Sequence, residues 1–267
     1  MPSRIPAQLL ICALAWAASP AAAQPFDTAG TRALGMAGAF VAVADDGSAV
    51  YWNPGALAAG PFFSMLLERG GLERRAPGEA GGRSRSATLF AIGTPPLGFA
   101  YYRLRQSDGG DEGLRSLITH HAGVTLVQTL VPGVSVGATL KYVRGIAAAA
   151  PPPAGLSGER LLDLAENLVG RAGNRFDADA GVLLSAGLLR IGLSARNLLS
   201  PSFETPSGLA LRLRRQARLG AALVDRDRWA VAADLDLTAP ETGERRVALG
   251  AERWLGRRWA IRGGVRG

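Results

Sequence analysis

From residue 61 to the C-terminus, the chain is a series of short segments in which apolar and polar residues alternate. In the last segment, three apolar side chains would share one face of an extended chain, and arginines would occupy the other. The apolar set is Trp259, Ile261 and Val265. The basic set is Arg258, Arg262 and Arg266. Successive side chains of a β-strand point to opposite faces, so this period of two predicts a sheet with one apolar and one polar face.

About eleven such segments are expected, each near the roughly 9–11 residues of a membrane-spanning strand. They cover residues 62–69, 86–94, 97–105, 118–130, 134–144, 176–185, 189–197, 209–224, 228–237, 246–254 and 258–266. A soluble β-sandwich shows the same alternation with its apolar face inward. Long apolar faces, tryptophans near strand ends and very short turns favour the membrane instead. The sequence therefore predicts an all-β fold, an antiparallel transmembrane β-barrel.

The first 23 residues predict a signal peptide, with Arg4 as its basic start, an apolar core over residues 9–18 and an Ala-Ala-Ala cleavage site. Cys12, the sole cysteine, lies inside the apolar core, so a lipoprotein is the weaker interpretation and the mature chain has no cysteine. No later apolar run reaches about 18 residues. Only a closed barrel could therefore carry the mature chain across a membrane, and we expect a location in the cell outer membrane.

The chain is basic, with a formal net charge of +8, and Lys141 is its single lysine. A basic balance can indicate nucleic-acid binding. Here the arginines are spread along the strands of an exported chain, so we expect no nucleic-acid partner. Phosphates of lipid headgroups, or a polar barrel interior, explain them better.

Residues 30–60 (GTRALGMAGAFVAVADDGSAVYWNPGALAAG) are rich in Gly and Ala and poor in charge. Ser48 is placed to cap a short helical turn. Pro54 suits the first turn of the next helical piece, and Gly60 suits its end. These features predict a compact hatch, or plug, against or inside the barrel; the alternative is an ordinary loop-rich N-terminus. The expected divisions are a signal peptide (1–23), a hatch (24–60) and barrel strands (61–267).

Two segments interrupt the strand series. Residues 70–85 are charged and rich in glycine, which predicts a loop. Residues 146–174 contain an Ala/Pro tract and then a helix over residues 159–169, with one apolar face. The apolar face is Leu161, Leu164, Ala165 and Leu168. We interpret this helix as one that packs on the barrel rim, with a substrate-contacting lid as the alternative.

Sequence patterns typical of catalysis or metal binding are weak. Residues 133–137 match G-x-S-x-G, but no His follows Ser135, as that motif requires. An acylhydrolase pairing Ser135 with His120 or His121 remains the enzyme alternative. Adjacent histidines on a strand face opposite sides and cannot share a metal. Asp177 and Asp179 lack the acidic residue that would complete a calcium loop and are expected to face the lumen. We therefore expect no enzyme, no catalytic residue, no metal and no cofactor.

The stretch from Gly30 to Leu57 resembles the N-terminal signature of the FadL/TodX-type outer-membrane transporters and of their PorV-like and TraF-like relatives. The matching pieces are Gly-Met-Ala-Gly-Ala-Phe (35–40), Asp-Asp-Gly-Ser-Ala (45–49) and Trp-Asn-Pro-Gly-Ala-Leu (52–57). The chain departs from the pattern at Ala37 and Gly55, where one small residue replaces another. Later pieces around residues 176–181, 196–198 and 215–220 also resemble this superfamily, so the resemblance covers most of the mature chain.

The resemblance implies a fourteen-stranded barrel with an N-terminal hatch in its lumen, past which hydrophobic molecules move. Bacterial single-chain barrels have an even number of strands. With about eleven segments visible, we expect a chain that lacks its last strands at the C-terminus. For the PorV-like relatives the resemblance implies a partner in protein secretion or surface assembly instead, and the residues do not decide between the two branches.

The first hypothesis is passive transport of hydrophobic small molecules, such as long-chain fatty acids, through the hatch region. Its expected partners are outer-membrane lipid and a hydrophobic ligand; the alternative adds secretion machinery. The hatch and gating set is Gly35, Gly38, Asp45, Asp46, Asn53 and Pro54. The ligand-contact set is Met36, Phe40, Tyr51, Trp52 and Leu57. Asp45, Asp46 and Asn53 would fix the turns by hydrogen bonds from side chain to backbone.

Overall fold

A computed structural model describes residues 29–75, 82–110, 113–153, 156, 158–226, 228–238, 245–256 and 258–267. The expected signal peptide lies outside the described residues. Most of the described chain is antiparallel β-structure, as the alternation predicted. Eleven strands form one sheet in which chain neighbours are spatial neighbours, and a short hairpin, β8–β9, interrupts the series between β7 and β10.

The sheet strands have the following bounds: β1 (Ser64–Arg75), β2 (Gly82–Thr94), β3 (Leu97–Gly110), β4 (Gly113–Val131), β5 (Val134–Ala150), β6 (Arg171–Ala186), β7 (Leu189–Arg196), β10 (Gln216–Asp225), β11 (Trp229–Asp236), β12 (Val247–Leu255) and β13 (Trp259–Arg266). The hairpin consists of β8 (Ser202–Glu204) and β9 (Ala210–Arg212). The expected number of sheet strands is thus confirmed for the described residues, although β1 to β6 extend further than the alternation indicated.

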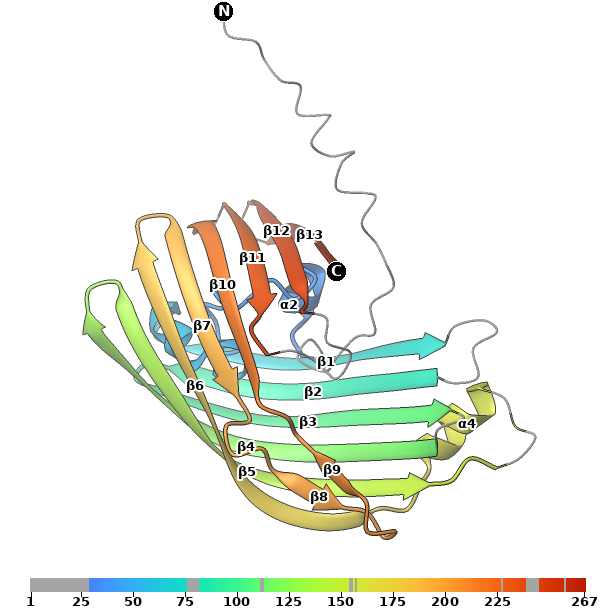
Figure 1. The fold of residues 1–267 in the computed structure, drawn as a ribbon. Coiled ribbons are helices and arrows are strands. Elements are labelled where there is room, and N and C mark those ends of the chain that lie inside the picture. The colour runs from blue at the N-terminus through green and yellow to red at the C-terminus, as the bar shows by residue number, and fades with distance from the viewer. Residues whose placement is uncertain are drawn as a thin grey trace, which may run out of the picture.

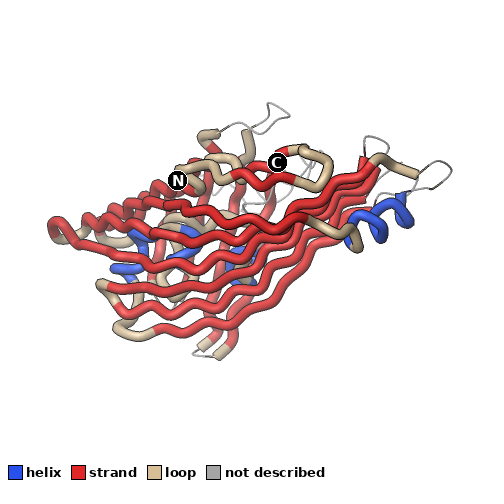
Figure 2. Tube along the Cα trace, turned by 90° about the horizontal axis from the view of Figure 1, so that it is seen from below, coloured by secondary structure: helices blue, strands red, loops and turns tan. Residues whose placement is uncertain are grey.

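The sheet curves around an N-terminal segment that lies on its concave side (Figure 1). We call residues 29–60 the inner segment. It contains α2 (Thr31–Gly35), α3 (Ala49–Trp52) and the 3-10 helix η3 (Pro54–Ala59). In a view from below, these short helices lie behind the wall of strands (Figure 2).

The first and last strands do not pair with each other among the described residues, so the sheet is open along this seam. Helix α2 contacts both sides of the seam. The backbone N–H of Thr31 donates to Glu68 Oε2 on β1 at 3.0 Å. On the other side, Gly35 packs so closely on β13 that an added Cβ would lie 3.1 Å from the Arg262 Cβ.

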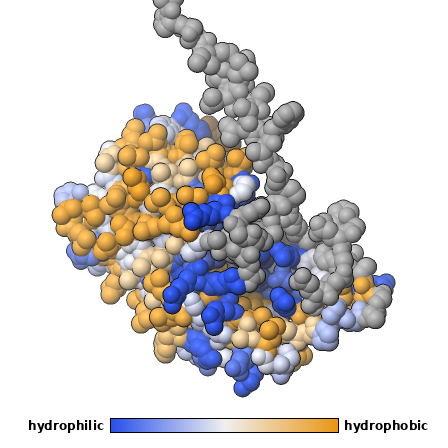
Figure 3. Space-filling view, viewed as in Figure 1, coloured by the Kyte–Doolittle hydropathy of each residue, from blue (hydrophilic) through white to orange (hydrophobic). Residues whose placement is uncertain are grey.

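The two faces of the sheet have the polarity opposite to that of a soluble sandwich. On the outward face, Leu67 and Leu140 are 74% and 63% exposed. On the inward face, Lys141 and Arg218 are only 0% and 1% exposed. Figure 3 shows hydrophobic residues over the region where β6, β7 and β10 lie in Figure 1, with hydrophilic residues gathered near the centre of the view.

Very short turns join the strands at one end of the sheet, including β2–β3, β4–β5 and β6–β7. The other end carries longer connections, one of which holds helix α4 (Gly158–Glu166) between β5 and β6. The prediction of a loop over residues 70–85 is wrong for most of that range, because β1 and β2 pair in register up to Arg75 and Gly82.

The predicted strand over residues 209–224 is also interrupted. Between β9 and β10, the backbone forms hydrogen bonds outside the main ladder. The N–H of Leu213 donates to the Pro201 carbonyl at 2.9 Å, and the Arg214 carbonyl accepts from Asn197 Nδ2 at 3.0 Å. The hairpin places Phe203 against Val143 on the inward face of β5.

Helix α4 packs on β3 and β4 at the end of the sheet with long connections, as expected for a rim helix (Figure 2). Its buried residues Leu161 and Ala165 cluster with Leu114. Leu164, predicted on the same face, is 39% exposed, so that assignment is wrong. Among the helices in the described parts of the chain, none has the length and apolar character to cross a bilayer.

Candidate functional site

The inner segment packs against a band of inward-facing glycines on the sheet. The glycine band is Gly93, Gly98, Gly137, Gly181, Gly192, Gly220, Gly250 and Gly264. At each of these, an added Cβ would come within 3.1 Å of an inner-segment atom. Several members are directly opposite on neighbouring strands, such as Gly137 with Gly181 and Gly192 with Gly220. From β5 to β13 the backbone of the inner segment lies directly on the backbone of the wall, whereas Gly93 and Gly98 meet the side chains of Leu57 and Val50.

The Asn-Pro-Gly turn provides the main contact with β5 and β6. Asn53 is fully buried and donates from Nδ2 to the carbonyls of Val41 and Val182, both at 3.0 Å. Its Oδ1 accepts from the N–H of Gly55 at 3.1 Å. Ser135 Oγ on β5 donates to the Gly55 carbonyl at 2.7 Å. Both polar atoms of the Asn53 side chain and both backbone polar groups of Gly55 thus have partners on the turn, the inner segment or the wall.

Pro54 opens η3 and Gly60 ends it, as predicted. The two departures from the family motif lie in tight places. Ala37 adopts a left-handed φ of 55°, a conformation that favours glycine. An added Cβ at Gly55 would come 2.7 Å from the Gly181 carbonyl oxygen, so this position needs glycine.

The Asp-Asp-Gly-Ser turn is held as predicted at Asp46, but not at Ser48 or Asp45. Asp46 Oδ1 accepts from the N–H of Ser48 at 2.8 Å. The Ser48 hydroxyl also bonds to Asp46 and makes no capping bond to α3, so the predicted cap is wrong. Asp45 makes ion pairs rather than a turn-fixing bond: its carboxylate pairs with Arg32 at 2.7 Å and with Arg190 at 3.3 Å.

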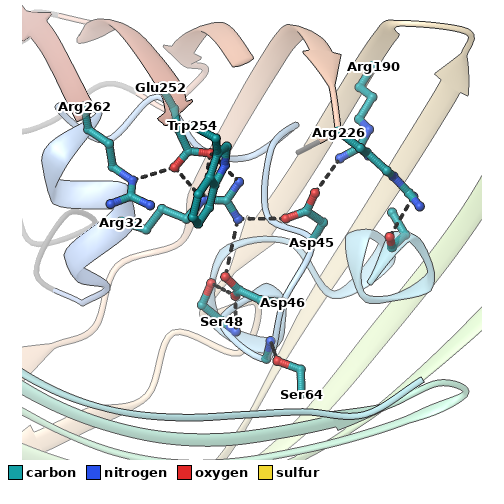
Figure 4. Close-up of polar contacts among 12 residues, drawn as sticks. Arg32, Asp45, Asp46, Ser48, Ser64, Arg190, Arg226, Glu252, Trp254 and Arg262 are labelled. Atoms are coloured by element: carbon teal, nitrogen blue, oxygen red, sulfur yellow. Dashed lines mark hydrogen bonds and ion pairs between the residues drawn. The ribbon is translucent and has the colours of Figure 1, made fainter. Parts of the chain in front are cut away.

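Arg32 of α2 is the centre of a charged network that joins the inner segment to the far end of the sheet (Figure 4). Its guanidinium bonds to Asp45, to Asp46 at 3.4 Å and to Glu252 on β12 at 2.9 Å. Glu252, only 2% exposed as a side chain, also accepts from Arg262 Nε on β13 and from Trp254 Nε1 at 3.1 Å. Burial lowers the pKa of Arg32, but hydrogen bonds and charge from Glu252 and Asp45 outweigh burial and raise its pKa above its ordinary value.

Further polar contacts fix the backbone of residues 38–41 to β10 and β11. The N–H groups of Phe40 and Val41 donate to Asp234 Oδ2 at 2.9 and 3.0 Å. Arg218 donates from Nη1 to the Gly38 carbonyl at 3.1 Å and pairs through Nε with Asp236 at 2.6 Å. Gly38 itself has a φ of 88°, which glycine adopts without strain.

All of the predicted ligand-contact residues are buried: Met36, Phe40, Tyr51, Trp52 and Leu57 are each at most 1% exposed. Phe40 and Trp52 pack edge to face with ring centroids 5.7 Å apart, and Tyr51 packs on Tyr102 of β3 at 5.2 Å. The Arg196 guanidinium lies 3.7 Å from the Tyr51 ring centroid. In this arrangement a ligand could touch these side chains only if the inner segment moved.

A second polar cluster lies on β5 and β6. Lys141 Nζ pairs with Asp177 at 2.8 Å and with Asp179 at 2.6 Å, and it bonds to Asn197 Oδ1 at 3.3 Å. Both acids face inward, as predicted. His121 stacks on Tyr102 at 4.3 Å between centroids and bonds to Thr119. No group of three or more His, Cys, Asp or Glu side chains suited to a metal ion occurs in the described ranges.

The alternative acylhydrolase pairing is wrong. Ser135 lies opposite Thr129, whereas His121 lies opposite Val143, eight residues further along β5. At roughly 3.3 Å per residue, the serine and the histidines are more than about 20 Å apart. His120 and His121 face opposite sides, as expected: His121 is buried, and His120 bonds through Nδ1 to the Tyr101 hydroxyl at 2.7 Å on the outward face.

The sequence did not identify which residues of the sheet contact the inner segment. Glu252, Arg262 and Arg190 were signalled only as polar positions of alternating strands, and the glycine band only as small residues within strands. The period of two could have placed both sets on the inward face. It could not identify partners, since Arg32 and Glu252 are 220 residues apart.

Comparisons with known proteins agree with this architecture. A family model described as "F plasmid transfer operon, TraF, protein" matches residues 113–236. No curated protein matches the chain. Among solved structures, the CymD monoaromatic hydrocarbon channel matches with a TM-score of 0.60 and 13% identity, over 91% of this chain and 84% of that chain. The P. putida toluene transporter TodX matches with a TM-score of 0.58 and 13% identity, over 91% and 83%.

A TodX monoaromatic hydrocarbon channel deltaS2 mutant matches with a TM-score of 0.58 and 10% identity, over 91% of this chain and 84% of that chain. The chain therefore has the fold of these channels. The resemblance predicted from the N-terminal motif is confirmed at the level of the fold, and the TraF-like part of it agrees with the family model.

Proposed function

We propose that this protein is an outer-membrane β-barrel that passively transports hydrophobic small molecules, with the inner segment as its hatch. The observation that carries the proposal is the inverted polarity of the sheet, with exposed leucines outside and buried charges inside. In membrane barrels an apolar outer band of this kind faces the hydrocarbon. The fold shared with channels for toluene and other monoaromatic hydrocarbons supports a hydrophobic cargo.

As a hatch, the inner segment would close the lumen at the end with short turns; its contacts with strands from β2 to β13 through the glycine band support this role. The predicted gating residues are its attachment points: Asn53 and Pro54 on β5 and β6, and Asp45 and Asp46 in the charged network. Transport requires the inner segment to leave some of these contacts. Long-chain fatty acids and monoaromatic hydrocarbons are both cargo classes to be tested.

A reversible tether tests this movement. Gly47 lies in the inner segment, and its N–H donates to Ser64 Oγ on β1 at 2.8 Å; an added Cβ at Gly47 would lie 3.5 Å from that oxygen. The double variant Gly47→Cys, Ser64→Cys should form a disulfide that fixes the segment to the wall. Cys12 is the sole native cysteine and would be replaced by Ser in every variant.

We expect uptake of toluene or oleate by cells to fall on oxidation of the double variant and to recover on reduction. Each single cysteine variant serves as the control and should transport at the native rate in both conditions. A boiled and an unboiled sample compared on a gel would verify that each variant forms a folded barrel in the outer-membrane fraction. Uptake that is equal in the oxidised and reduced double variant would contradict the hatch.

The alternative is a partner in protein secretion or surface assembly. The match to a plasmid-transfer family model over β4 to β11 favours this possibility. Its expected result is co-purification with secretion machinery and no uptake of either hydrophobic probe by the native protein.

A further inference from the structure

A compact group of basic side chains lies on the outward face of three neighbouring strands. Arg103 on β3 is directly opposite His120 on β4, and His120 is directly opposite Arg144 on β5. We call these three residues the basic patch. They alternate along their strands with the buried residues Tyr102, His121 and Val143, and therefore face away from the lumen.

The fold does not neutralise the two arginines of the basic patch. Within the described residues, no carboxylate forms an ion pair with Arg103 or Arg144. The two arginines lie on either side of β4, with His120 between them. His120 is held by its bond to the Tyr101 hydroxyl at 2.7 Å. The patch thus presents two arginines on the outward face, on either side of His120.

On the outward face, the rows of residues next to the patch change in character towards the short turns. Two residues nearer the short turns, the next outward row begins with Tyr101 on β3. Tyr101 is opposite Ala122 on β4, Ala122 is opposite Tyr142 on β5, and Tyr142 is opposite Phe176 on β6. These three aromatic side chains are 41%, 44% and 65% exposed. The next row is apolar and also exposed: Phe99, Val124 and Leu140. A change from aliphatic to aromatic to cationic residues is typical of a barrel surface that passes from hydrocarbon to headgroups.

The basic patch also lies at a height on the strands that suits a contact with lipid headgroups. Beyond it, β3, β4 and β5 continue towards the end with long connections, where α4 covers the strand ends. In outer-membrane barrels that end faces outward, and the short turns face the periplasm. The aromatic row lies on the short-turn side of the patch.

We propose that the basic patch binds the phosphate of an anionic membrane-lipid headgroup in the outer leaflet. Arg103 and Arg144 are separated by one strand, or roughly 10 Å, so both guanidinium groups can reach one phosphate group above His120. Arginine binds phosphate through paired N–H donors. The aromatic row below would contact the upper acyl chains of the same lipid. The proposal rests on the membrane placement in the proposed function and does not depend on transport.

The test compares phosphatidylglycerol with phosphatidylcholine, titrated into folded protein in neutral detergent and measured by native mass spectrometry. The test variant is Arg103→Gln, Arg144→Gln. The matched control, Arg115→Gln, Arg175→Gln, loses the same charge on the same region of the sheet, from positions that alternate onto the inward face and are exposed there. Outer-membrane fractionation and the gel shift on boiling check membrane placement separately.

We expect native protein and control to bind phosphatidylglycerol more tightly than phosphatidylcholine, and the test variant to bind phosphatidylglycerol roughly tenfold or more weakly than native. The variant Arg103→Lys, Arg144→Lys keeps the charge and should retain most of the preference, which covers the case of a poorly folding glutamine variant. Equal affinity of native protein for the two lipids would overturn the proposal. So would equal phosphatidylglycerol affinity of the native and test proteins.

Discussion

The inner segment is attached to the barrel wall in two contrasting ways on its two sides. Towards β5, β6 and β7, backbone packs on the glycine band, and Asn53 bonds to a wall carbonyl. Towards β12 and β13, the backbone contacts at Gly250 and Gly264 are joined by charged side chains, with Arg32 and Arg262 sharing Glu252. The first side has almost no capacity to adjust, because close-packed backbone cannot change rotamer. The second can rearrange, exchange partners and respond to ions.

This difference bears on the proposed movement of the inner segment. Close backbone packing is insensitive to salt and is lost as a unit. Ion pairs with partly exposed arginines, such as Arg32 at 19% and Arg262 at 24% of their side chains, are weakened as salt screens them. We therefore expect the charged side to release first and the glycine side to act as the hinge.

The largest effect is expected from Gly181→Ala. Its added Cβ would collide with Asn53 Oδ1 and Pro54, and overpacking of this kind costs about 3 kcal/mol. The inner segment should become accessible to trypsin at Arg32 while the barrel still shifts on an unboiled gel. Gly263→Ala is the control, since an added Cβ there meets nothing within 4 Å. Equal trypsin resistance of the two variants would show that the glycine band does not hold the segment.

A smaller effect is expected from Glu252→Gln. The change removes the carboxylate that Arg32 and Arg262 share, and we expect a loss of about 2 kcal/mol, less than for a fully buried pair because both arginines are partly exposed. Trypsin cleavage at Arg32 should rise and lose most of its dependence on salt. Glu204→Gln is the matched control, because its pair with Arg171 is exposed on both sides and contributes little. If trypsin cleavage of Glu252→Gln kept the salt dependence of the native protein, the salt-sensitive contact would not be the one at Glu252.

The smallest effect is expected from Asp46→Asn. Asp46 is 32% exposed as a side chain and pairs with Arg32 at 3.4 Å, and asparagine can still accept the bond from the Ser48 N–H. We expect a loss of about 0.5 kcal/mol and a barely altered rate of trypsin cleavage. A loss as large as that of Glu252→Gln would mean that the turn, rather than the β12 contact, holds the charged side.

Features that depend on residues close in the sequence could be predicted, and features that depend on distant residues could not. The period of two depends on neighbouring residues, so it identified the strands and the inward positions of Asp177 and Asp179. The split between β9 and β10 was missed because residues 213 and 214 bond to Pro201 and Asn197, partners that no alternation reveals. Ser48 was assigned as a cap from its type, but its backbone is already helical, with φ −68° and ψ −14°, whereas a capping residue is non-helical; its hydroxyl bonds to Asp46 instead.

For the candidate site, the sequence identified the right stretch but only part of its chemistry. The turn residues Asp46 and Asn53 do bond to backbone as expected. The role of Asp45 depends on Arg190, 145 residues away, and could not be inferred without the fold. The division of the chain at residue 60 and the gating role of the predicted residues stay predictions.

Contact of the inner segment with both β1 and β13 also bears on the order of events during biogenesis. Thr31 bonds to Glu68 near the start of the sheet, and Arg32 pairs with Glu252, which the ribosome adds more than two hundred residues later. Contacts of such high sequence separation form late, after the intervening loop has been closed by other structure. We therefore expect docking of the inner segment to be a late step of assembly, reached only once β12 and β13 have been delivered.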